Sequence, residues 1–337
     1  MDALSQLLSE REWLLADGAT GTTLFDMGLQ SGDAPELWNS TAPDKIKKLY
    51  SGAVNAGSDI FLTNSFGGNA SRLKLHAAES RVHELNRLAA EIGRDVADAA
   101  GRKVVVAGSV GPTGEIMAPL GALTHEGAVE MFHEQAEGLK DGGADVLWLE
   151  TISAPEEYRA AAQAFALADM PWCGTMSFDT AGRTMMGVTS PDFAALVESL
   201  PNPPLGFGAN CGTGASDLLR TVLGFSATGT DIPIIAKGNA GIPKYVEGHI
   251  HYDGTPDLMA EYAVLARDSG ARIIGGCCGT KPEHLEKMRA ALENRPADSA
   301  PSLDAIVAAL GPFSSSDDGS SGKAAAPERR KRRRARA

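Results

Sequence analysis

The stretch ARIIGGCCGTKPEHLEKMRAAL (residues 271–292) decides the fold prediction, because it contains one complete strand–helix unit. Its first part is a continuous apolar run that ends in glycines, as expected for a parallel strand covered on both faces. Its second part is helix-like, and Thr280 before Lys281-Pro282 is a helix-start signal. Two adjacent cysteines, Cys277 and Cys278, lie at the junction. Neighbouring cysteines rarely form a structural disulfide, because the ring that they would close is strained.

The same unit recurs through most of the chain. Expected strands lie at 13–18, 59–65, 103–111, 144–151, 171–179, 205–212, 233–241 and 271–279. Expected helices lie at 43–57, 79–100, 125–143, 154–168, 191–200, 215–225, 255–270 and 281–292. Eight such units in about 290 residues predict a single (β/α)8 TIM barrel. The alternative, a doubly wound open sheet, would need fewer strands and a topological switch point.

The charge distribution separates the chain into two parts. From Ser314 onward the sequence has eight Lys/Arg and three Asp/Glu, which leaves 23 and 40 in residues 1–313, a balance of −17. We therefore expect a barrel domain over 1–313 that does not bind nucleic acid by itself. Residues 314–337 are low in apolar side chains and are predicted to be a disordered basic tail, either a solvated segment or one that docks on an acidic partner or RNA.

Cysteine usage and hydropathy bear on the compartment. The four cysteines are too few and too scattered for a disulfide framework, which favours the cytoplasm. No apolar run approaches the roughly 20 residues that span a bilayer, and the N-terminus has no secretory pattern. We expect a cytoplasmic protein that does not associate with membranes.

Polar residues and glycines end nearly every predicted strand. In an α/β barrel the active site lies at the C-terminal ends of the strands, so these positions should share one mouth. They are Asp17-Gly18, Thr63-Asn64-Ser65, Gly108 to Gly114, Glu150-Thr151, Ser177 to Asp179, Asn210-Cys211, Asn239 and Cys277-Cys278. Three of the four cysteines belong to this set, although more than sixty residues separate Cys211 from the other two.

Three thiolates with one open position match the geometry of catalytic rather than structural zinc. Such a site suits a thiol substrate, because the metal takes the thiol as fourth ligand and deprotonates it. The alternative is that these cysteines are buried and inert, or have a redox role. We accept the inert interpretation for Cys173, which lies inside a predicted strand.

Beyond these residues, the chain resembles the zinc-dependent homocysteine S-methyltransferases, which include the homocysteine module of cobalamin-dependent methionine synthase and betaine–homocysteine methyltransferase. The resemblance runs from about Leu14 to about Leu292. The matching stretches are LADGATGT (15–22), ELWN (36–39), LTNSFGGN (62–69), GSVGPTG (108–114), ETISAPEE (150–157), TMSFDTAGRTMMG (175–187), GANCG (208–212), AKGNAGIP (236–243) and GGCCGT (275–280).

The resemblance implies zinc on Cys211, Cys277 and Cys278, with the sulfur of the substrate homocysteine as fourth ligand. It also implies that Asp17, Gly18 and Glu150 hold the amino-acid end of homocysteine. A carboxylate suits an ammonium group. Taken singly, an aspartate beside glycine is often only a turn residue, and a glutamate at a strand end is often only an acid at a helix start. The further residues that it implies around the pocket are Thr63, Ser65, Phe66 and Asn239.

The methyl donor is open at this point. Betaine is a quaternary ammonium, which aromatic faces hold best. The betaine-type members resembled here place aromatic residues where this chain has Gly67 and Thr151. The corrinoid signature Asp-x-His-x-x-Gly does not occur in these 337 residues. We therefore expect methylcobalamin on a separate corrinoid-binding protein, with this chain as the homocysteine-activating subunit of a split methionine synthase.

Two other functions stay open. One is a free-standing methyltransferase that uses betaine or S-methylmethionine. The other, of a different class, is a non-catalytic zinc-binding or thiol-sensing protein. A sensor would need the cysteines but not Asp17, Thr63 and Glu150 together, so their joint presence favours an enzyme.

Overall fold

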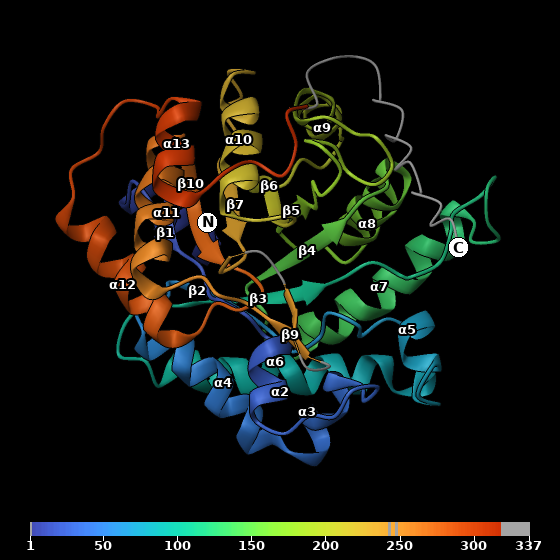
Figure 1. Ribbon diagram of the computed structural model, residues 1–337. Coiled ribbons are helices and arrows are strands. Elements are labelled where there is room, and N and C mark those ends of the chain that lie inside the picture. The colour runs from blue at the N-terminus through green and yellow to red at the C-terminus, as the bar shows by residue number, and fades with distance from the viewer. Residues whose placement is uncertain (1, 242–243, 247–248, 318–337) are drawn as a thin grey trace, which may run out of the picture.

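The computed structural model describes residues 2–241, 244–246 and 249–317, and these contain an eight-stranded parallel barrel (Figure 1). The strand order is β1-β10-β7-β6-β5-β4-β3-β2, and a parallel bridge between Ala16 and Ile60 brings the first and last strands together. The (β/α)8 prediction is confirmed, and the open-sheet alternative is excluded. The strands are β1 (Leu14–Leu15), β2 (Ile60–Leu62), β3 (Val105–Val110), β4 (Val146–Ile152), β5 (Trp172–Met176), β6 (Gly206–Cys211), β7 (Ile234–Gly238) and β10 (Ala271–Gly276).

A helix follows each strand and covers the outside of the barrel. These helices are α4 (Pro43–Asn55), α6 (Val82–Asp98), α7 (His125–Asp141), α8 (Pro155–Leu167), α9 (Ser190–Glu198), α10 (Ala215–Ser226), α11 (Pro256–Asp268) and α12 (Pro282–Asn294). Their starts follow the signals in the sequence. Pro43, Pro256 and Pro282 each stand at the beginning of a helix, and the Thr124 side chain accepts the Gly127 N–H at the start of α7.

The barrel has two apolar cores. Side chains that point inward, among them Leu14, Ile60, Val105 and Trp148, form the smaller core. The N-terminal helix α1 (Ala3–Glu10) adds Leu4 and Leu7 to it. Side chains that point outward form the larger core with the surrounding helices. Since α1 packs into the inner core, polar chemistry is left to the mouth at the other end of the strands.

Cys173 lies in the inner core and is fully buried. Its position agrees with its interpretation as a buried core residue.

Several elements were not predicted. Short helices occupy the segment after β1: α2 (Gly21–Asp26), η1 (Pro35–Leu37) and α3 (Trp38–Thr41). After β2 follow α5 (Ala70–Lys74) and η2 (Glu79–Arg81), and after β7 an antiparallel pair, β8 (Lys244–Val246) and β9 (His249–His251).

The C-terminal part extends the fold beyond α12. Helix α13 (Leu303–Leu310) buries Ile306, and the following residues run past α10 toward α9 (Figure 1). The predicted boundary at 313/314 therefore falls within a segment that contacts the barrel as far as Asp317. The remainder of the predicted tail, 318–337, lies outside the described residues.

Within the described ranges, no helix has both the length and the apolar character needed to cross a membrane.

Candidate metal centre and substrate pocket

Cys211, at the end of β6, and Cys277 and Cys278, directly after β10, lie together at the barrel mouth. Their Sγ atoms are all within 4.8 Å of one another, and all three residues are half-buried. In the described part of the chain they form the one group of three or more His, Cys, Asp or Glu residues close enough to share a metal ion. The convergence predicted from the strand ends is therefore present.

The backbone around the thiols adopts conformations that few residues tolerate. Cys211 has a φ of 62°, a left-handed value that costs a non-glycine residue about 1–3 kcal/mol. Gly276 must be glycine, because a Cβ there would lie 2.2 Å from the Thr280 side chain. Both features are consistent with a site where surrounding contacts hold the chain in a strained geometry.

Two asparagines connect the thiol loops. Asn239 donates from Nδ2 to Cys211 Sγ at 3.7 Å and to Gly212 O at 2.9 Å, and its Oδ1 accepts the Cys278 N–H at 3.1 Å. Asn210 donates to Cys277 Sγ at 3.9 Å. Asn239 was predicted as a pocket wall and lies between the two loops. The role of Asn210 was missed, although it directly precedes Cys211. We call Cys211, Cys277, Cys278, Asn210 and Asn239 the thiol side.

The close packing of the thiols changes their acidity. A hydrogen bond with Cys277 lowers the pKa of Cys211, but the bond with Cys278 and burial outweigh it and raise that pKa to about 11. A bond with Cys211 lowers the pKa of Cys278, but the bond with Cys277 and burial raise it to about 12. Three ionised thiols this close would repel one another strongly, so a cation is needed to hold them as thiolates.

The donor set fits zinc. Thiolate sulfur is a preferred zinc ligand, and three ligands leave the fourth tetrahedral position for substrate. Tyr252, which sequence reasoning missed, hydrogen bonds to Cys278 from the segment after β9. Its distance in sequence from the cysteines hid this contact.

Opposite the thiols, three charged side chains meet inside the mouth. They are Glu150 of β4, Lys237 of β7 and Asp17, which directly follows Ala16. Lys237 Nζ donates to Asp17 Oδ1 at 2.7 Å, and Asp17 Oδ2 accepts the Leu62 N–H at 2.8 Å. Both residues are buried. Burial alone would lower the pKa of Lys237, but the carboxylates of Asp17 and Glu150 raise it above its usual value. Lys237 was not predicted, although a lysine at the end of an apolar strand was a visible signal.

Glu150 is bound on one side only. Its Oε1 accepts a hydrogen bond from Ser109 Oγ at 2.5 Å, and its Oε2 has no hydrogen-bond partner among the described residues. Burial raises the pKa of Glu150 above its usual value and outweighs Lys237 and the Ser109 bond, which lower it. We call Asp17, Glu150, Lys237 and Ser109 the carboxylate side.

The other predicted pocket residues have different positions. Thr63 and Ser65 are fully buried and bonded to each other at 2.6 Å, and both bond to Ser109 of β3. They therefore support the carboxylate side from within. Phe66 is half-buried, and its carbonyl accepts the Gly111 N–H. A Cβ on Gly18 would lie 2.5 Å from the Thr280 carbonyl, so Gly18 lets the chain after β1 approach the chain after β10.

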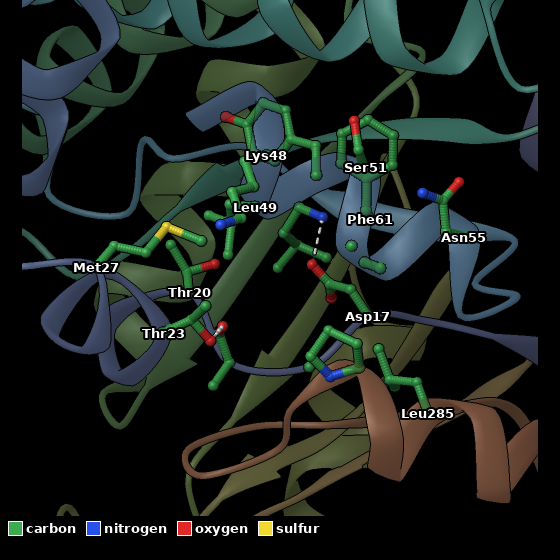
Figure 2. Close-up of a pocket in the computed structure, with 17 residues that line it drawn as sticks. Asp17, Thr20, Thr23, Met27, Lys48, Leu49, Ser51, Asn55, Phe61 and Leu285 are labelled. Atoms are coloured by element: carbon green, nitrogen blue, oxygen red, sulfur yellow. Dashed lines mark hydrogen bonds between the residues drawn. The ribbon is translucent and has the colours of Figure 1, made fainter. Parts of the chain in front are cut away.

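A cavity of about 410 Å³ adjoins the mouth between β1, α2, α4 and the start of α12. Figure 2 shows Asp17 at its edge, with Lys48, Ser51 and Asn55 of α4 opposite. None of the three cysteines lines it. The three thiols therefore lie outside this cavity, whose lining includes Asp17 and Gly18. The lining is Asp17, Gly18, Ala19, Thr20, Thr23, Met27, Lys48, Leu49, Tyr50, Ser51, Gly52, Ala53, Asn55, Phe61, Leu62, Pro282 and Leu285.

Comparison with known proteins decides the family. Residues 14–292 match the family described as homocysteine S-methyltransferase, which is well over half of the chain. The chain belongs to the homocysteine S-methyltransferase family. Membership makes it a methyltransferase enzyme and sets aside the non-catalytic thiol sensor.

Two proteins named methionine synthase are among the relatives of this chain. The protein of Mycobacterium tuberculosis is 31% identical over 335 residues, which is 92% of this chain and 27% of the relative. The protein of Mycobacterium leprae is 31% identical over 308 residues, which is 86% of this chain and 25% of the relative. The chain thus spans about a quarter of the length of the curated relatives that it matches.

A solved structure of similar size is the homocysteine methyltransferase MmuM from Escherichia coli in its metallated form. It is 25% identical with a TM-score of 0.70, and the match covers 86% of this chain and 99% of MmuM. The oxidised form of MmuM matches equally in fold, with a TM-score of 0.70.

Proposed function

We propose that this chain transfers a methyl group to the thiol of homocysteine, in a zinc-dependent reaction that yields methionine. The observation that carries the proposal is the convergence of Cys211, Cys277 and Cys278 within 4.8 Å in a member of this family. These three residues would hold the zinc. When bound, the metal supplies a thiolate nucleophile at neutral pH by lowering the pKa of the substrate thiol.

The carboxylate side is the partner that we propose for the amino-acid end of homocysteine. As ionised groups, Asp17 and Glu150 carry two negative charges and Lys237 carries one positive charge. One substrate ammonium would therefore bring the net charge of the group to zero. Glu150 Oε2 is the open acceptor, since both oxygens of Asp17 are already bonded inside the protein. We therefore assign the direct ammonium contact to Glu150 and propose that Asp17 contributes mainly through Lys237. Backbone N–H groups near Gly18 suit the substrate carboxylate.

For the methyl donor we propose methylcobalamin on a separate corrinoid-binding protein. Two small residues support this. A Cβ on Gly67 would lie 3.0 Å from Glu36 Oε1, which accepts the Gly67 N–H, so a ring there would displace Glu36. Thr151 makes two hydrogen bonds with Asn210: its N–H donates to Asn210 Oδ1, and its Oγ1 accepts from Asn210 Nδ2. Neither position can contribute an aromatic face to a trimethylammonium group. The similarity to proteins named methionine synthase supports methionine as the product.

A second candidate is a free-standing enzyme that uses a small methyl-onium donor such as S-methylmethionine or betaine. The favouring observation is that the chain matches 99% of MmuM, a homocysteine methyltransferase of similar length. This candidate shares the zinc site and the homocysteine pocket and differs only in the donor.

One experiment tests both. The purified full chain, loaded with zinc, is given homocysteine with methylcobalamin, S-methylmethionine or betaine in turn, and methionine is measured. We expect methylcobalamin, free or on a corrinoid protein, to outperform betaine by an order of magnitude or more, because each missing aromatic face is worth about 0.5–2 kcal/mol. Turnover of betaine with sub-millimolar apparent affinity and none with methylcobalamin would support the second candidate instead. Absence of methionine with every donor would reject the proposed activity.

A further inference from the structure

The segment from Gly311 to Asp317 contacts the loop that presents Cys211. This loop, residues 211–214, connects β6 to α10, and three of its residues have positive φ: Cys211 at 62°, Gly212 at 76° and Gly214 at 145°. Helix α10 begins at Ala215, and its N-cap residue, Gly214, makes no side-chain capping hydrogen bond. A left-handed cysteine persists only where neighbours hold it there.

Asp217, in the first turn of α10, joins the loop to the C-terminal segment. Its Oδ2 accepts hydrogen bonds from Thr213 Oγ1 at 3.0 Å and from the Ser314 N–H at 3.0 Å. The Thr213 and Ser314 hydroxyls also lie 3.2 Å apart. Thr213 is two residues from Cys211, so a residue more than one hundred positions later in the chain is bonded to the loop of a metal ligand.

The receiving surface on α10 consists of buried polar groups that need these partners. Asp217 is 7% exposed and Arg220 9% exposed, and they bond to each other at 2.8 Å. Arg220 also donates to the Ser315 carbonyl at 2.9 Å, and its guanidinium lies 4.5 Å from the centre of the Phe313 ring. The Ser216 hydroxyl donates to the Gly311 carbonyl at 2.8 Å. The contacts are mostly to backbone atoms, which fixes the path of the segment.

The opposite side of the loop is held by the thiol side. Asn239 donates to the Gly212 carbonyl at 2.9 Å. The loop is therefore held on one side by Asn239 and on the other by Asp217 and Ser314, which both contact Thr213 of the loop. The Ser314 contacts are available only when the C-terminal segment lies along α10, as it does in Figure 1.

We infer that residues 311–317 are a clamp that holds the Cys211 loop in its left-handed conformation and so preorganises Cys211 for zinc. This inference rests on the proposed function, because it concerns the same metal site. The clamp residues are neither metal ligands nor substrate contacts. Their effect is to fix the position of the Cys211 loop. Without the clamp, Cys211 relaxes toward an extended conformation and its Sγ leaves the other two thiols.

The test uses the full chain with two single substitutions and their combination. Ser314→Pro removes the N–H donated to Asp217, and Thr213→Val removes the hydroxyl at the other end of the same contact. Thr228→Val, at the far end of α10, is the matched control. Zinc affinity is measured by competition with a chromogenic chelator, and hydrogen exchange of residues 211–214 is measured in the metal-free protein.

Each clamp variant is expected to lose about tenfold in zinc affinity, the lower end of losses seen when groups that orient metal ligands are removed. The double variant should lose little more zinc affinity than either single variant, because both substitutions disrupt the same contact between the loop and the C-terminal segment. Exchange at 211–214 should accelerate in both, and Thr228→Val should match the unaltered chain. If the affinity of both single variants stays within twofold and exchange is unchanged, the clamp is refuted. Additive losses in the double variant would refute it as a unit.

The readouts separate this inference from the proposed function. If the unaltered chain binds no zinc, the proposed function fails, and hydrogen exchange in the metal-free protein still decides whether the clamp holds the loop. If the unaltered chain binds zinc and the variants bind it equally well, only the clamp fails.

Discussion

The three cysteines of the thiol side are only half-buried, whereas Asp17 and Lys237 of the carboxylate side are buried against each other. Cys211, Cys277 and Cys278 are held through backbone and amide contacts that leave sulfur available. Asp17 and Lys237 are instead bonded to each other before any substrate arrives. The two sides should therefore respond differently to substitution: the thiol side through ligand binding, and the buried Asp17–Lys237 pair of the carboxylate side first through stability.

The largest effect on stability is expected from Asp17→Asn. The change leaves the buried Lys237 ammonium without its closest carboxylate, and breaking a buried pair in this way costs about 3–5 kcal/mol. Urea unfolding measures the loss. Asp26→Asn is the control, since Asp26 pairs with Lys281 on the surface and such pairs are worth at most about 1 kcal/mol. Equal losses in the two variants would mean that the buried pair does not stabilise the fold as described.

Glu150→Gln should act on substrate rather than on stability. The substitution keeps the size of the side chain and removes the charge that we assign to the ammonium of homocysteine. Loss of one charged hydrogen bond costs about 1.5–3 kcal/mol, or about one to two decades in affinity. Calorimetric titration of homocysteine into the zinc-loaded protein measures it, with zinc content as the control. A parallel loss of zinc would identify Glu150 as structural.

On the thiol side, Asn239→Ala should lower zinc affinity by about tenfold. It removes the contacts from one side chain to Cys211, Gly212 and Cys278 that connect the two ligand loops. Asn294→Ala, an exposed residue at the end of α12, is a matched control. Chelator competition provides the measurement, and unchanged affinity in Asn239→Ala would remove its proposed positioning role.

The smallest effect is expected from deleting residues 318–337. The deleted stretch is low in apolar side chains, and the clamp residues up to Asp317 are retained. The melting temperature, zinc content and turnover with free methylcobalamin should be those of the full chain. A drop of several degrees would contradict this. A loss of turnover only with a protein-bound donor would identify the basic stretch as a docking element.

The sequence was sufficient to predict the barrel and the thiol cluster, for a physical reason. Continuous apolar runs between helix-start signals indicate parallel strands, and parallel strands in a closed barrel bring their ends to one mouth. Cys211 and Cys277 could therefore be placed together from their positions at strand ends alone.

The sequence was not sufficient for contacts that depend on side-chain direction between distant strands. Lys237 and Asp17 are 220 residues apart, and the strand-end rule does not say which side chains point inward to meet. The same limit applies to Thr63 and Ser65: they follow β2, which is only three residues long, and they are buried in contact with Ser109 rather than open to the mouth. The C-terminal clamp was missed because its contacts use backbone atoms, which composition does not reveal.

The most direct test of the account is the zinc content of three forms of the chain: unaltered, Cys278→Ala and Cys173→Ala. Cys278 belongs to the thiol cluster, whereas Cys173 is a buried thiol in the inner core. We expect about one zinc per chain in the unaltered protein and in Cys173→Ala, and almost none in Cys278→Ala, because two thiolates do not complete the site. Full zinc in Cys278→Ala, or none in the unaltered chain, would contradict the proposed metal centre and the function built on it.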